Sequence, residues 1–377
     1  MSAGQTMSRA SRGMQRVLTM LALCAGVVAS DATALTGDGR QVTGAFAMTN
    51  AGVAVGGERI ALDALVGLTV PGDRATALDQ GVVLRDGTIL RGVVSSVQAG
   101  QVQVDSDQAG ALTIPFAQMR AVVLAPRSLA ALDTLPVDQG GAWLANGDRV
   151  SGTCAFLNDQ AVGIDTGRKV MQVPRSRVDL LLFAGAAPVA PGLRLLLADG
   201  SRLAGRPTGG VSLSIQTLAG LVPVPLLLVR AAWTESGAVQ PLGLLTLPAP
   251  TQQALLDEPG MLLRNRGSDG GVLHAAGRSW DRGLCLRAGS SVVVPAAGAA
   301  RLVAEVAVTD GSPGSVDFRV LRGSTVLWSS GPRRAGDVPM SCGVATDGAE
   351  SLTLECARPA GTSAAATGIW GWAALIR

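Results

Sequence analysis

The sequence predicts an all-β protein in which tandem small barrel-like repeats precede a C-terminal β-sandwich of jelly-roll type. Three observations support this fold class. A seven-residue turn pattern recurs four times in the first two-thirds of the chain. Apolar and polar residues alternate at the strand period of two through the last third. Gly and Asp-Gly turn signals separate the apolar runs, as antiparallel strands require.

Residues 1–30 have the composition of a secretory signal peptide. Arg9, Arg12 and Arg16 provide positive charge without a nearby acid. The apolar run Val17 to Val28 is shorter than the ~20 residues that span a bilayer. The alternative is an N-terminal anchor that is not cleaved. We therefore expect a secreted or periplasmic protein with no membrane span after cleavage, at Val28-Ala29-Ser30 or Ala32-Thr33-Ala34.

The charge of the chain argues against a nucleic-acid partner. The whole sequence has 31 basic and 28 acidic residues, a net charge of +3. The three arginines of the signal segment leave with it, so the remaining chain is neutral. A neutral chain releases few counterions when it meets phosphates, which removes the main source of nucleic-acid affinity.

The recurring pattern is Asp/Asn-Gly-x-x-Val/Leu-x-Gly, which predicts a hairpin. The first Gly follows Asp or Asn because a tight turn needs a positive φ angle. The second Gly suits a strand that bends sharply or that another backbone approaches closely, as in a small barrel. The copies are DGRQVTG (Asp38 to Gly44), DGTILRG (Asp86 to Gly92), NGDRVSG (Asn146 to Gly152) and DGSRLAG (Asp199 to Gly205).

The starts of the copies, at 38, 86, 146 and 199, lie at a spacing typical of internal repeats. We expect a signal peptide at 1–30, two repeats in 31–125, two more in 140–235, a linker at 236–260 and the sandwich at 261–377. Within the linker, Thr251 to Glu258 has an N-cap Thr and helix-forming residues, which predicts a short helix.

Around the turn, the extended pattern Leu-x-Asn/Asp-Gly-x-x-Val-x-Gly resembles the first motif of the Sm-like small barrels. Leu144 to Gly152 is the best instance. The resemblance implies barrel geometry. The RNA-binding signature of Sm proteins, a D-x-x-M-N-like loop with an Arg-Gly pair, has no counterpart here. We therefore interpret the repeats as a spacer or protein-contact array and expect no RNA partner.

The segment from Gly271 to Arg377 contains the densest strand signals and four of the six Trp residues. Six or seven short runs in roughly 100 residues are typical of a sandwich. Asp310-Gly311, Gly323 and Asp347-Gly348 mark the turns. The inward residues of the three clearest runs are Leu302, Ala304, Val306 and Val308; Val316, Phe318 and Val320; and Leu352, Leu354 and Cys356.

This last third of the chain resembles the NPCBM family of carbohydrate-binding modules. The resemblance implies a galactose-binding-like sandwich that recognises sugars. Arg287 stands where members of the family usually carry a His. The matching pieces are GRSWDRGLCLRAGSS (Gly277 to Ser291), VAVTDG (Val306 to Gly311), GSVDFRVLRGSTVLWSSG (Gly314 to Gly331), GAESLTLEC (Gly348 to Cys356) and WAALI (Trp372 to Ile376).

The residues that catalysis would need are scarce, so we expect no enzyme activity, no cofactor and no metal. His274 is the only histidine, and its polar surroundings predict a surface position. Neither C-x-x-C nor H-E-x-x-H occurs. The acids Glu305 and Asp317 fall on outward strand positions, where we expect solvent.

Sugar recognition commonly combines a Trp face with planar polar side chains. Trp328 and Trp370 could offer a further aromatic surface for a sugar ring. In the alternative interpretation, Trp328 and Trp372 fill the core of the sandwich. The partner is then a carbohydrate, or an envelope protein if the chain is a structural scaffold. The candidate ligand-binding residues are Trp280, Asp281, Arg282, Arg287 and Asp310.

Cys154, Cys285, Cys342 and Cys356 remain after the signal segment. Cys342 and Cys356 flank one predicted turn on the apolar phase of their strands, which makes them candidate cross-strand neighbours. They either form a disulfide or are two buried thiols.

Overall fold

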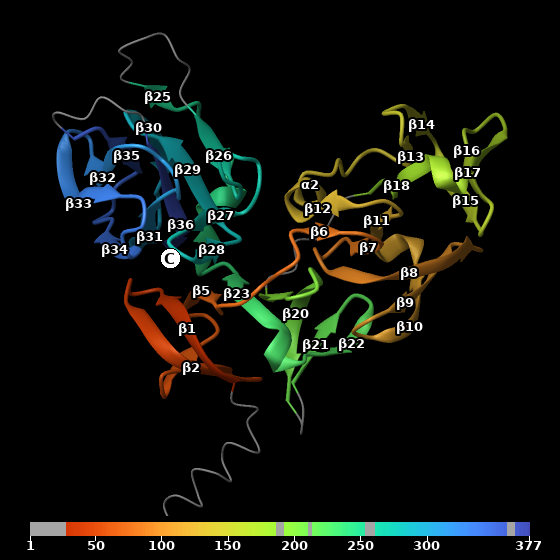
Figure 1. Cartoon of the computed structure of the whole chain (residues 1–377), viewed down its shortest axis with the longest axis horizontal. Helices are drawn as coiled ribbons and strands as arrows, with labels where there is room; N and C mark the ends of the chain where they lie inside the picture. The colour runs from red at the N-terminus through yellow and green to blue at the C-terminus, as the bar shows by residue number, and fades with distance from the viewer. Residues whose placement is uncertain (1–27, 186–191, 210–212, 253–260, 360–365) are drawn as a thin grey trace, which may run out of the picture.

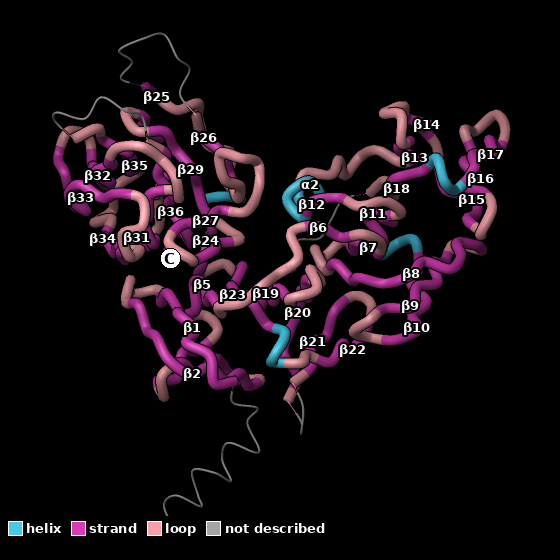
Figure 2. Tube along the Cα trace, viewed as in Figure 1, coloured by secondary structure: helices cyan, strands magenta, loops and turns pink. Residues whose placement is uncertain are grey.

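The computed structural model describes residues 28–185, 192–209, 213–252, 261–359 and 366–377, and nearly all of their regular secondary structure is strand (Figures 1 and 2). Within these ranges the one α-helix is α2 (Leu129–Asp133), and no helix there is long and apolar enough to cross a membrane. The predicted all-β class is therefore confirmed. Most of the predicted signal peptide, residues 1–27, lies outside the described residues.

Each turn pattern follows the first strand of a unit with one recurring topology, and we call these units repeats 1 to 4. Consecutive strands form antiparallel hairpins, and the last strand returns to pair with the first. Repeat 1 contains β1 (Val28–Thr36), β2 (Gln41–Thr49), β3 (Gly52–Val55), β4 (Glu58–Ala61) and β5 (Leu65–Thr69). Repeat 2 contains β7 (Gly81–Leu84), β8 (Ile89–Gln98), β9 (Gln101–Ser106), β10 (Gly110–Pro115) and β11 (Met119–Val123).

Repeats 3 and 4 follow the same order, and a short 3-10 helix precedes the closing strand in repeats 2 to 4. Repeat 3 contains β13 (Gly141–Leu144), β14 (Arg149–Ser151), β15 (Thr153–Leu157), β16 (Ala161–Asp165), β17 (Val170–Pro174) and β18 (Val178–Leu182). Repeat 4 contains β19 (Gly192–Leu197), β20 (Arg202–Thr208), β21 (Ser214–Thr217), β22 (Gly220–Pro223) and β23 (Val229–Glu235). The 3-10 helices are η1 (Phe116–Gln118), η2 (Arg175–Arg177) and η3 (Leu226–Leu228).

The two glycines of the pattern have the roles that the sequence predicts. The turn glycines Gly39, Gly87, Gly147 and Gly200 have φ angles of 85°, 91°, 88° and 89°. A Cβ on the second glycine would overlap a facing backbone, as at Gly152 against the Asp165 carbonyl. Each unit can therefore bend its second strand only because a side chain is absent at that position.

The closing strands join the repeats in an order that differs from their order along the chain. β5 of repeat 1 pairs with β23 of repeat 4, and β11 of repeat 2 pairs with β18 of repeat 3. A two-strand ribbon of β6 (Ala77–Leu78) and β12 (Arg127–Ser128) lies beside α2. The pairing therefore crosses the predicted division into 31–125 and 140–235.

The C-terminal part is a sandwich of two antiparallel sheets. In the first sheet the order is β26 (Leu262–Arg264), β29 (Gly283–Arg287), β36 (Thr367–Ile376), β31 (Arg301–Val308) and β34 (Met340–Ala345). In the second sheet the order is β25 (Thr251–Gln252), β30 (Ser290–Pro295), β35 (Ser351–Ala357), β32 (Ser315–Arg322) and β33 (Thr325–Arg334). The predicted inward residues pack between these sheets.

Parts of the predicted linker belong to the sandwich. β24 (Val239–Pro241) pairs with β36, and the 3-10 helix η4 (Leu242–Leu244) follows it. The predicted helix at Thr251 to Glu258 is wrong at its start, because Thr251 and Gln252 pair with β30 as a strand. Its remainder, 253–258, lies outside the described residues.

The outer face of the first sheet is covered. A hairpin of β27 (Leu273–Ala275) and β28 (Arg278–Trp280) lies on this face, and repeats 1 and 4 pack against both. The buried residues of this layer include Trp233 and Leu35 from the repeats and Val303 and Trp372 from the sheet. We call this layer the central core. It makes the sandwich and the repeats contiguous (Figure 1).

Candidate functional site

Trp280, the first candidate ligand residue, is buried in the central core. Its relative exposure is 0%, and its indole stacks on Gly371 of β36, where a Cβ would lie 2.5 Å from the ring. The indole Nε1 donates a hydrogen bond to Glu305 Oε2 at 2.6 Å. The ring therefore packs inside the protein and offers no face for a ligand.

Glu305 corrects the prediction of a solvated outward acid. The side chain does point out of the first sheet, but repeat 1 and the β27–β28 hairpin cover it, and its exposure is 1%. Gln41 Nε2 donates to Oε1 at 2.7 Å, and Arg278 Nη1 lies 3.1 Å from the same oxygen. Glu305 thus connects β31, the hairpin and repeat 1 through one carboxylate.

Asp281 and Arg282 also lie in contacts between the sandwich and the repeats. Asp281 Oδ2 accepts a hydrogen bond from Arg74 Nη1 at 2.7 Å. The Arg282 guanidinium lies 3.0 Å from Glu235 and 3.4 Å from Asp133. Asp281 is 9% exposed and Arg282 is 6% exposed. The structure therefore brings Trp280, Asp281 and Arg282 together as a docking contact, and covers the surface that the sequence predicted for a ligand.

Glu235 is the centre of this ionic contact. It accepts hydrogen bonds from Arg282, from Arg194 Nε at 3.1 Å and from Trp233 Nε1 at 2.8 Å. Burial alone would raise the pKa of the Glu235 carboxyl, but the charges of Arg282 and Arg194 and these hydrogen bonds lower the pKa to about 2. The carboxylate is therefore charged across the neutral range and holds the two arginines in place.

The remaining two candidates, Arg287 and Asp310, lie at the end of the first sheet, outside the docking contact. Arg287 pairs with Thr367 of β36, and Thr309 donates its backbone N–H to the Thr367 carbonyl at 2.9 Å. Arg287 and Asp310 thus lie at the same end of the three neighbouring strands β29, β36 and β31. Arg287 is half-buried, and the Asp310 side chain is 42% exposed.

His274 joins Asp310 at this edge. Its Nδ1 lies 3.0 Å from Asp310 Oδ2, and its side chain is 51% exposed, so the predicted surface position is confirmed. Asp310 Oδ1 accepts the Ala276 backbone N–H at 2.8 Å. The neighbouring Thr309 hydroxyl is buried and has no hydrogen-bond partner among the described residues. We call the set His274, Arg287, Thr309 and Asp310 the Asp310 face.

The other tryptophans of the sandwich divide between core and surface. Trp370 fills the space between the sheets, edge-to-face with Phe318 at a centroid distance of 5.4 Å, so it is no exposed platform. Trp372 is also buried, but in the central core. Trp328 on β33 is half-buried, 6.4 Å from Trp370. Of the sandwich's four tryptophans, Trp328 alone retains contact with solvent.

Cys342 and Cys356 are free, buried thiols. Cys342 lies on β34 of the first sheet, whereas Cys356 lies on β35 of the second sheet. The predicted cross-strand pairing is wrong because the turn between them carries the chain from one sheet to the other. Asp317, predicted to be solvated, is 6% exposed and accepts hydrogen bonds from Arg319 and Ser329 at 2.7 Å each.

Fold and contacts define a two-sheet module docked on a strand-repeat array. Residues 251–376 match the family model of the NPCBM/NEW2 domain. The C-terminal third of the chain is therefore an NPCBM domain, as the sequence resemblance predicts. A comparison of the whole sequence with curated proteins finds no match.

Solved structures with similarity to the chain include three sets of CBM51 modules. A Clostridium perfringens ZmpB structure, CBM51-2 with GlcNAc and INT domains, has 14% identity, covers 44% of this chain and 36% of its own, and gives a TM-score of 0.33. The C. perfringens GH95 module with methyl-galactose has 20% identity. The match covers 36% of this chain and 99% of that structure, with a TM-score of 0.31. The tandem modules of a Streptococcus pneumoniae family 98 glycoside hydrolase have 12% identity. The match covers 91% of this chain and 87% of that structure, with a TM-score of 0.32. The chain thus spans about a third of the first of these structures.

Proposed function

We propose that the chain is a non-catalytic binding protein that recognises carbohydrate through the Asp310 face of its C-terminal sandwich. The match of residues 251–376 to the NPCBM/NEW2 domain carries this proposal. Export by the signal segment at 1–30 would place the protein outside the cytoplasm, in the periplasm or beyond, where envelope and extracellular glycans are found.

The chemistry of the Asp310 face supports sugar recognition. Sugar hydroxyls are bound by planar polar groups that both donate and accept hydrogen bonds. The face combines the exposed Asp310 carboxylate and His274 imidazole with the half-buried Arg287 at the same sheet edge.

A binding role fits the acids of the sandwich better than glycoside hydrolysis does. Hydrolysis needs two carboxyl groups that flank the substrate in one cleft. Glu305, Asp281 and Asp317 are each buried against arginines or other donors. These three carboxylates thus stabilise the packing, whereas the Asp310 carboxylate at the sheet edge is substantially exposed.

Retention of the full-length chain on a glycan array tests this function. N-acetylglucosamine and methyl-galactose, named with two of the similar structures, are the first probes. We expect at least one glycan to retain the wild-type chain and Asp310→Asn to weaken retention. Asp347→Asn is the matched control, because Asp347 is an exposed acid in a second Asp-Gly turn of the sandwich. Equal loss in both variants would argue against the Asp310 face.

One observation favours a second candidate function, a structural or protein-contact scaffold of the cell envelope. The contact between the sandwich and the repeats buries Trp280, Trp233 and Trp372. If the folded wild-type chain is retained by no glycan on the array, the scaffold becomes the better account.

A further inference from the structure

We propose that repeat 3 contains a second ligand site, around Trp143, that binds a saccharide carrying a carboxylate group. The site lies at the opposite end of the molecule from the sandwich (Figure 1). It does not depend on the function proposed for the Asp310 face.

Trp143 is exceptional among the equivalent positions of the repeats. It lies four residues before the turn glycine, where repeats 2 and 4 have Val83 and Leu196. Those two side chains are 2% and 1% exposed in the central core. Trp143 also packs against this core, but it is only half-buried. Repeat 3 thus presents a large aromatic side chain at a position that other repeats cover.

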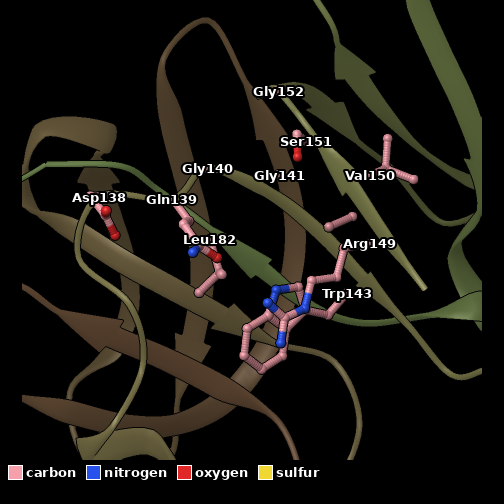
Figure 3. A pocket seen from close by; sticks show the side chains of 11 residues that line it. Asp138, Gln139, Gly140, Gly141, Trp143, Arg149, Val150, Ser151, Gly152 and Leu182 are labelled. Atoms are coloured by element: carbon pink, nitrogen blue, oxygen red, sulfur yellow. The ribbon is translucent and has the colours of Figure 1, made fainter. Parts of the chain in front are cut away.

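A pocket of about 340 Å³ opens beside this ring (Figure 3). That volume falls within the range of small-molecule sites. Glycine backbone forms part of the wall, so no side chain fills the space. The larger and polar side chains at its border are Asp138, Gln139, Trp143, Arg149, Ser151 and Leu182, with Ala142 and Val150 beside them.

Two guanidinium groups lie against the indole. The Arg149 guanidinium carbon is 4.3 Å from the ring centroid, and that of Arg127 is 5.3 Å away. Figure 3 shows Arg149 across the Trp143 ring. Arg127 Nε is buried and finds no hydrogen-bond partner in the described part of the chain. Asp138 and Arg149 line the pocket itself, and Arg127 adds a second positive charge at the indole.

These groups select the chemistry of the ligand. A guanidinium binds a carboxylate through two parallel hydrogen bonds. Because the Arg149 guanidinium stacks on the Trp143 indole, it is held in position for such a contact. With its carboxylate bound there, the pyranose ring of the ligand would pack on the remaining surface of the indole, since sugar rings commonly stack on aromatic faces. Asp138, Gln139 and Ser151 are placed at the border for the hydroxyls. A uronic acid has the carboxylate, the pyranose ring and the hydroxyls that these groups would bind.

Calorimetric titration of the full-length chain tests the site, with oligogalacturonate as the probe. The matched neutral probe is the same oligomer with its carboxylates methyl-esterified. We expect the acid form to bind at least tenfold more tightly than the ester. Arg149→Gln should remove this preference, and Trp143→Ala should abolish binding. Arg168→Gln, which changes an exposed arginine elsewhere on repeat 3, should leave both affinities unchanged.

The thermal unfolding of each variant is recorded beside its titration. If Trp143→Ala does not fold, Arg149→Gln decides, since Arg149 is exposed and its replacement keeps the indole. Equal affinity for acid and ester, absence of binding to the folded wild-type chain, or unchanged preference in Arg149→Gln would each overturn the proposal.

Discussion

The indole of Trp372 lies directly on Gly67, at the contact between the sandwich and repeat 1. A Cβ on Gly67 of β5 would overlap the indole ring. Trp372 has a φ angle of 49°, and the pairing of β31 with β36 shifts register between Val303 and Glu305. This bulge turns Trp372 away from the space between the sheets and toward the repeats, where it meets Trp233 at a centroid distance of 5.8 Å.

Gly67→Ala should therefore weaken the joint between the two parts of the chain. The added methyl group has no room unless the indole or a strand moves, and overpacking of this kind costs about 1–3 kcal/mol. The free energy of unfolding, measured in denaturant, checks this loss. Gly237→Ala is the control, because an added Cβ there meets nothing within 4 Å, and we expect a change within about 0.5 kcal/mol. Equal stabilities of the two variants would contradict the close contact.

Glu305→Gln tests the carboxylate that joins the sandwich, the hairpin and repeat 1. The amide cannot accept all the bonds that Trp280, Gln41 and Arg278 donate, and it leaves Arg278 without its counter-charge. Loss of one member of a buried ion pair costs about 3 kcal/mol or more. The exposed Glu58–Arg40 pair provides the control Glu58→Gln, for which we expect less than about 1 kcal/mol. Similar losses in both variants would show that Glu305 is accessible to water.

The stability of the protein should fall as the pH is lowered from about 5 to 2. The folded-state pKa of Glu235 is lowered from 4.5 to about 2, so its contribution is complete above the unfolded pKa and is lost as the pH approaches the folded value. The difference corresponds to roughly 3 kcal/mol. Glu235→Gln should flatten the pH dependence of the unfolding free energy over this window.

The control for the pH experiment is Asp38→Asn. Hydrogen bonds from Arg40 and Thr36 also lower the pKa of Asp38 to about 2, but its side chain is 52% exposed and solvent screens the interaction. We expect the pH dependence of this variant to remain close to that of the wild type. A wild-type curve that is flat between pH 5 and 2 would contradict the ionic contact around Glu235.

The four described thiols should be unreactive in the native protein. Burial raises the pKa of Cys154 and of Cys285 to about 12, and raises the pKa values of Cys342 and Cys356 further. Iodoacetamide should therefore modify these four residues only after denaturation, as peptide mass spectrometry would show. A disulfide-linked Cys342–Cys356 peptide pair in unreduced native protein would contradict the separate sheets.

Local patterns in the sequence predicted the turns and the sheet faces well. The positive φ angle of Gly87 depends on its own turn, and the inward positions of Phe318 and Leu354 follow from strand alternation. Such features need only neighbouring residues, so the sequence contains them directly.

The candidate site was harder to predict because it depends on distant partners. Trp280 lies in a polar stretch of sequence, but Glu305 and Gly371 meet it from other strands. The bulge at Trp372 reverses strand alternation, which no period-two pattern reveals. The turn pattern alone does not indicate a site at Trp143, although an aromatic residue where the other repeats have aliphatic residues is a signal.

A calorimetric titration with the glycan that the array selects tests the proposed function most directly, through two residues that the sequence placed in one site. Asp310→Asn should weaken binding about tenfold, the loss expected for one charged hydrogen bond. Asp281→Asn removes the partner of Arg74, so it should lower the unfolding free energy but change the affinity by less than about twofold. The opposite pattern, in which folded Asp281→Asn loses the glycan and Asp310→Asn retains it, would contradict the account.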